Sequence, residues 1–205
     1  MGLMEETVEE RMKILESLAT AAPGAQARRQ RLFAAIEATS HEFHALGIEM
    51  NHRYESKAIY VDDEIGQPPE WPADPILYHQ SSTFPGSRLP HAWLNSRVPR
   101  KEYTSTLDLA GHGNFCILTG IGGDEWKSAA GKVGKELGLD IPAYSIGWGQ
   151  DYEDVYRDWE KKREVGEMGC VLVRPDRYVC WRALHKMDDS ENMLRQVLKK
   201  ILGLC

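Results

Sequence analysis

The sequence predicts a mixed α/β fold, and three observations carry that prediction. From residue 115 onward, short apolar runs typical of strands alternate with helical patterns. The order of these elements is β-α-β-α-β-β-α, with one extra strand before it. The last two strands flank Pro175-Asp176-Arg177, a turn sequence that closes a β-hairpin. A parallel βαβ unit joined to an antiparallel hairpin and a closing helix is the thioredoxin-like topology.

Residues 1–63 are expected to form a helical hairpin followed by a short strand. Apolar residues at helical spacing predict a helix over residues 3–20 and a second over residues 25–46, after which Gly47 offers a C-cap. The apolar period then shifts towards alternation, which predicts a strand over residues 58–61.

Residues 64–103 are expected to form an irregular connector. The segment contains seven of the ten prolines of the chain, and proline supplies no backbone N–H for a helix or a central strand. A structureless span of this length is unusual inside a compact domain. We therefore expect the connector to pack against something else.

Residues 104–205 are expected to form the thioredoxin-like domain. Three helices are predicted to begin at Asp124, at Asp151 and at Asp189 or Ser190, because Asp and Ser are favoured N-cap residues. The first of these helices ends at Gly138. The predicted strands are residues 105–109, 115–119, 141–146, 170–174 and 178–182.

Charge and hydropathy narrow the class of partner. The chain has 25 Lys and Arg against 31 Asp and Glu, a net charge of −6, which argues against nucleic acid. No apolar stretch approaches the roughly 18 residues that a membrane span requires. The N-terminus lacks the pattern of a signal peptide, so we expect a cytoplasmic protein.

The cysteines and the glycine-rich turn at residues 120–124 predict a fold without its redox chemistry. A thioredoxin-type enzyme places a nucleophilic Cys at this turn, where a helix N-terminus stabilises the thiolate. The turn has no Cys, and Asp124 adds a negative charge. The four cysteines form no CxxC pair and are expected to be inert, buried thiols: Cys116, Cys170, Cys180 and Cys205.

Two other patterns are too weak to predict a site. The turn fails the dinucleotide fingerprint, because Glu125 stands where that fingerprint needs glycine. His41 and His44 flank Glu42 in an HExH spacing that differs from the metal motif HExxH, so surface histidines are favoured. We therefore expect no catalytic, cofactor-binding or metal-ligating residue in this chain.

One segment is more specific: Pro85-Gly86-Ser87-Arg88-Leu89-Pro90-His91-Ala92-Trp93-Leu94. Together with residues 43–50 and 53–56 before it and residues 172–182 after it, this segment resembles the C-terminal region of the FAD-dependent aromatic hydroxylases, of the phenol and 2,4-dichlorophenol monooxygenase type. The resemblance covers residues 43–202. The family implies a Rossmann-like FAD domain, a substrate domain and a C-terminal thioredoxin-like domain. By this resemblance the chain lacks two flavin motifs of the family, the N-terminal GxGxxG that opens a βαβ unit and the later Gly-Asp motif that contacts the ribityl and phosphate groups of the flavin.

The resemblance implies an accessory region of an enzyme that uses FAD and NAD(P)H to hydroxylate a phenolic ring. Alone, the region is expected to bind neither cofactor and to be non-catalytic. Residues 1–63 are expected to be the tail of the flavin and substrate part. The expected partners of the region are the FAD-binding and substrate domains, in the same or a separate chain, with a homodimer as a further option. The candidate interdomain contacts are Arg88, Pro90, His91 and Trp93.

Two alternatives stay open at this point. The chain could be a freestanding thioredoxin-like interaction module without redox activity, and such a module should show a polar surface. A region that has lost a docking partner should instead expose a large apolar face. Trp93 itself could close over the sheet of this chain rather than contact another domain.

Overall fold

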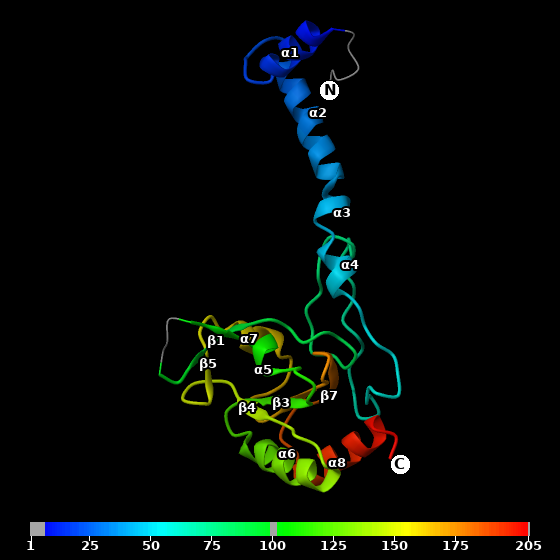
Figure 1. Cartoon of the computed structure of the whole chain (residues 1–205), viewed down its shortest axis with the longest axis vertical. Helices are drawn as coiled ribbons and strands as arrows, with labels where there is room; N and C mark the ends of the chain where they lie inside the picture. The colour runs from blue at the N-terminus through cyan, green and yellow to red at the C-terminus, as the bar shows by residue number, and fades with distance from the viewer. Residues whose placement is uncertain (1–6, 99–101, 205) are drawn as a thin grey trace.

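The computed structural model describes residues 7–98 and 102–204. In Figure 1 a helical arm stands away from a layered body, and the body holds two sheets flanked by helices. This architecture confirms the mixed α/β class. Among the described residues, no helix is long and apolar enough to cross a membrane.

The main sheet has four strands in the order β4-β3-β6-β7. They are β3 (Cys116–Thr119), β4 (Ala143–Ser145), β6 (Cys170–Val173) and β7 (Val179–Ala183). Strand β3 runs parallel to β4 and antiparallel to β6, and β6 pairs antiparallel with β7 as a hairpin. The predicted parallel unit and C-terminal hairpin are thus both present. Every residue of β3 and β6 is buried, because the sheet is covered on both faces.

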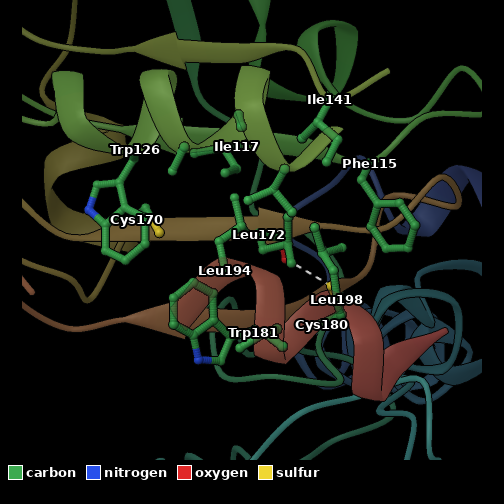
Figure 2. Packing of buried hydrophobic residues seen from close by; sticks show 14 of the residues in the cluster. Phe115, Ile117, Trp126, Ile141, Cys170, Leu172, Cys180, Trp181, Leu194 and Leu198 are labelled. Carbon is green, nitrogen blue, oxygen red and sulfur yellow. Dashed lines mark hydrogen bonds between the residues drawn. The ribbon is translucent and has the colours of Figure 1, made fainter. Parts of the chain in front are cut away.

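Helices α6 (Asp124–Leu137) and α8 (Ser190–Ile201) cover one face of this sheet, as Figure 2 shows. Helix α6 ends at Gly138, whose φ of +69° suits a glycine C-cap, and Asp189 caps α8 through its side chain. The rings of Trp126 and Trp181 meet edge to face at 5.5 Å between the helices and the sheet. Both helices were predicted from the sequence, but Asp124 is the first residue of α6 and not its N-cap. The N-cap of α6 is Gly123, and no side chain caps the helix there.

A second layer covers the opposite face of the main sheet. It is a three-stranded sheet in the order β2-β1-β5, formed by β1 (Trp93–Ser96), β2 (Thr104–Ser105) and β5 (Tyr152–Asp154). Two short helices, α5 (Thr106–Leu109) and α7 (Asp158–Lys162), complete the layer. Leu89, Leu94 and Trp159 are buried between the two sheets and form a second core.

The helix predicted from Asp151 is wrong. Residues 152–154 form β5, which pairs with β1, and the short helix α7 follows. The Asp151 carboxylate accepts hydrogen bonds from the backbone N–H and the hydroxyl of Ser145, the last residue of β4, and it pairs with Lys127. Asp151 therefore binds the end of a strand and does not cap a helix. The strand predicted over residues 105–109 is also wrong beyond Ser105, which caps α5 in a capping box with Asp108.

The N-terminal prediction needs three corrections. The helix expected over residues 25–46 is divided into α2 (Ala25–Ala38) and α3 (Ser40–Phe43), and α4 (Leu46–Met50) follows. Gly47 lies inside α4 and is not a C-cap. The strand expected over residues 58–61 is not formed; Ile59 is buried in the core and the N–H of Tyr60 donates to the carbonyl of Cys180. Helix α1 (Val8–Ser17) lies within its predicted range, and Arg28 of α2 donates to the Ser17 hydroxyl at 2.6 Å.

The connector is irregular as far as residue 92 and then departs from expectation. Strand β1 lies inside it and is the central strand of the second sheet. Pro85 and Pro90 come before the strand, so residues 93–96 keep the N–H groups that pairing with β2 and β5 requires. The division of the chain at residues 63 and 103 stays a prediction.

Candidate functional site

Backbone hydrogen bonds join the segment from Pro85 to Trp93 to the β6–β7 hairpin. The N–H of Gly86 donates to the carbonyl of Val179 at 2.7 Å, and the N–H of Leu89 donates to that of Arg177 at 2.9 Å. Gly86 has a φ of +96°, and a Cβ atom there would stand 2.4 Å from the carbonyl oxygen of Tyr54. The backbone path of the segment therefore depends on glycine at this position.

Arg88 lies at the junction of this segment with the hairpin. Its backbone forms an antiparallel bridge with Tyr178. Burial, followed by the charges of Arg88 and Lys162, lowers the pKa of His79 below its ordinary value, so that imidazole is neutral at pH 7. Two buried side-chain atoms lack a hydrogen-bond partner within the described part of the chain, Ser87 Oγ and Arg88 Nε, and both belong to this segment.

Pro90 and His91 have different surroundings. Pro90 is buried, and its carbonyl accepts a hydrogen bond of 2.7 Å from the Thr106 hydroxyl. His91 is exposed; its Nδ1 atom lies 2.7 Å from the Ser105 hydroxyl, and its carbonyl accepts from Lys162. Pro90 therefore fixes the segment to the body, whereas the His91 ring faces outward.

Trp93 lies on the outer side of the second sheet, with 44% of its surface exposed. Its ring meets that of His91 edge to face at 4.7 Å, and a row of tilted rings continues through Tyr103 to Tyr156 with centroid distances of 6.3 and 6.0 Å. We call these four residues the aromatic patch. The neighbouring Leu94, which is fully buried, packs against the main sheet in its place.

A buried ionic cluster near this segment was not predicted. The guanidinium of Arg182 on β7 donates to Glu64 at 2.8 Å and to Glu164 at 2.7 Å, and Glu164 also accepts from the Ser82 hydroxyl. The Arg182 and Glu64 side chains are only 8% and 4% exposed. Since Glu64 lies 118 residues before Arg182, no local spacing in the sequence could have indicated the cluster.

The glycine turn and the thiols offer no reactive group. A Cβ atom on Gly123 would stand 1.9 Å from the Thr119 hydroxyl oxygen, so this glycine serves the close contact between β3 and α6. Burial raises the pKa of Cys116 to about 12, and it also raises the pKa of Cys170 and Cys180. These thiols are therefore protonated at neutral pH, while Cys205 lies outside the described residues.

The HExH pattern at residues 41–44 does not form a metal site in the described residues. The exposed His41 ring pairs with Asp74 at 2.7 Å between Nε2 and Oδ2. Within residues 7–98 and 102–204, no cluster of three His, Cys, Asp or Glu side chains is arranged to hold a metal ion.

Comparison with known proteins gives the family. Residues 82–204 match the family described as aromatic-ring hydroxylase, C-terminal. The chain is 41% identical to 2,4-dichlorophenol 6-monooxygenase of Delftia acidovorans over 100% of its own length and 34% of that protein. It is 44% identical to phenol 2-monooxygenase of Pseudomonas sp. strain EST1001 over 89% of this chain and 29% of that protein.

Solved structures agree with this result. The flavin-dependent monooxygenase PieE, in complex with FAD and substrate, superposes with a TM-score of 0.73 and 37% identity over 98% of this chain and 34% of PieE. Aklavinone-11 hydroxylase, in a ternary complex with FAD and aklavinone, gives a TM-score of 0.60 at 32% identity over 74% of this chain and 26% of that one.

The chain belongs to the C-terminal family of the aromatic-ring hydroxylases. It spans about a third of the length of the curated relatives that it matches, and the match lies in their C-terminal part. The resemblance stated from the sequence is confirmed.

Proposed function

We propose that this chain is the C-terminal accessory region of an FAD- and NAD(P)H-dependent hydroxylase of phenolic compounds. The observation that carries the proposal is a match over the whole chain to only 34% of 2,4-dichlorophenol 6-monooxygenase. In such an enzyme the flavin supplies the oxygen-transfer chemistry when it is bound. We further propose that the enzyme acts in the cytoplasm, where NAD(P)H is supplied; a homodimer stays a prediction.

The role we propose for the aromatic patch is contact with the flavin and substrate domains. Exposed aromatic side chains are enriched at interfaces and carry much of their binding energy. Trp93 and Tyr103 are each 44% exposed, and Tyr156 is 53% exposed. A freestanding module should present a polar surface there, so the patch supports the accessory region over that alternative.

This region is expected to bind no FAD by itself, because its glycine turn does not fit a phosphate. A Cβ atom on Gly120 would stand 2.6 Å from the Glu167 carbonyl oxygen, and Asp124 and Glu125 begin α6 with two negative charges. Isothermal titration of the isolated chain with FAD should give no heat of binding. Micromolar binding would show that this chain contains an FAD site of its own and would contradict this expectation.

The proposed function is tested with a chimera. This chain replaces the matching C-terminal third of the Delftia acidovorans 2,4-dichlorophenol 6-monooxygenase. Because the chain supplies the accessory region, the purified chimera is expected to carry FAD and to show the visible absorption of a flavoprotein. A folded chimera without flavin would contradict the proposal.

Trp93→Ala should have different effects in two settings. In the isolated chain the half-exposed ring loses mainly its contact with His91, so we expect a loss of stability of about 1 kcal/mol or less. In the chimera the same change removes an interdomain contact and should lower the melting temperature clearly. Thermal melts of both proteins check this; a large loss in the isolated chain would refute the docking role of Trp93.

A further inference from the structure

Helices α1 to α4 form an arm, residues 8–50, that projects from the body (Figure 1). Hydrogen bonds attach this helical arm to the body at its base. The N–H of Gly47 donates to the Ile76 carbonyl at 2.9 Å, and the His41 ring pairs with Asp74. Farther out, α2 has a single buried residue, Ala25, among its 14. Most of α2 is thus exposed to solvent.

The exposed surface of the arm is rich in large apolar side chains. In helix α2, Phe33 is 63% exposed and Ile36 is 56% exposed. The full set is Val8, Met12, Leu15, Phe33, Ile36, Phe43, Leu46 and Ile48. Isolated apolar residues are normal on a protein surface, but many of them on one projecting element indicate a contact with another protein surface.

Helix α2 needs a neighbour to be stable. A helix of 14 residues is marginal in water by itself, and helices in proteins are stabilised mainly by packing of their apolar face. Arg28 and Arg29 hold the end of α1 against α2 through the Ser17 hydroxyl and the Leu18 carbonyl. These polar contacts leave Phe33 and Ile36 exposed.

We propose that the helical arm is the principal docking element of this chain and that its occupant is the flavin-bearing part of the same enzyme. This inference rests on the proposed function. The relatives are about three times as long as the matched region, and that region is their C-terminal part, so they contain a large body of protein available to cover the arm. The aromatic patch, on the second sheet of the body, is a separate contact.

The test is the double variant Phe33→Ser/Ile36→Ser, made in the chimera and in the isolated chain. In the chimera we expect a lower melting temperature and loss of most of the bound FAD, because the two side chains anchor the flavin-bearing part. In the isolated chain they touch solvent, so its melting temperature should not change. Trp148→Ser is the control, because Trp148 is 86% exposed and lies on the body.

Hydrogen exchange gives a second readout. Amides of α2 should exchange rapidly in the isolated chain and slowly in the unmodified chimera, where the helix is covered. Unprotected α2 amides in a chimera that holds FAD would overturn the docking role of the arm. So would a double variant that keeps its FAD and its melting temperature, or one that destabilises the isolated chain. An unmodified chimera without FAD would instead refute the proposed function, and the inference with it.

Discussion

Arg182→Ala is expected to lower the free energy of unfolding of this chain by about 3–5 kcal/mol, the cost of breaking a buried ion pair by removing one partner. The Arg182 side chain is 8% exposed and bonds Glu64 and Glu164 at once, so its loss leaves two carboxylates without their cation. It also removes the hydrogen bond of 3.2 Å that Arg182 donates to the Thr83 hydroxyl. The cluster joins β7 to residues near 64, 83 and 164, and we expect all three attachments to weaken together.

Urea denaturation followed by tryptophan fluorescence measures this loss. Arg157→Ala is the control, because Arg157 pairs with Glu160 at the surface with 74% of its side chain exposed, and water screens such a pair. The stability of Arg182→Lys should lie between that of the unmodified chain and that of Arg182→Ala, because a lysine ammonium keeps the charge but lacks the planar guanidinium that bonds two carboxylates at once. Equal stability of the Arg182→Ala and Arg157→Ala variants would show that the cluster does not hold the connector.

Trp181→Ala is expected to cost about 3–5 kcal/mol, the range for truncating a buried aromatic side chain. Trp181 has no exposed surface, stacks edge to face on Trp126 and donates through Nε1 to the Asp63 carboxylate at 3.0 Å. The change opens a cavity between the sheet and helices α6 and α8 and leaves Asp63 without its donor.

Calorimetric melts of Trp181→Ala and Trp148→Ala check this prediction. Trp148 is 86% exposed, so its removal should leave the melting temperature nearly unchanged. Similar melting temperatures for the two variants would place the core elsewhere in the molecule.

Local signals were enough to predict the elements on one face of the main sheet. Asp124 and Gly138 bound α6, the turn at Pro175 closes the hairpin, and Asp189 caps α8. Each of these depends on residues close together in sequence. Strand β5 was missed because it is defined by pairing with β1, more than fifty residues earlier, and that tertiary pairing overrides the helical pattern after Asp151.

The interdomain role of Arg88, Pro90, His91 and Trp93 stays a prediction, but the structure shows which of these side chains face outward. Pro90 is buried, whereas His91 and Trp93 are exposed. Whether Trp93 or Leu94 enters the core depends on the register of a four-residue strand, where a slip of one residue exchanges the two faces. The pairing of β1 with β2 and β5 sets that register, and those partners are distant in sequence.

The central claim is that this chain serves as the accessory region of a flavin-dependent phenol hydroxylase. The most direct measurement is turnover by the chimera with NADPH and 2,4-dichlorophenol, with the hydroxylated product quantified by chromatography. We predict NADPH oxidation that depends on the phenol and is matched by product, and none from the isolated chain. A chimera that holds FAD but oxidises NADPH without forming product, or an isolated chain that turns over alone, would contradict the account.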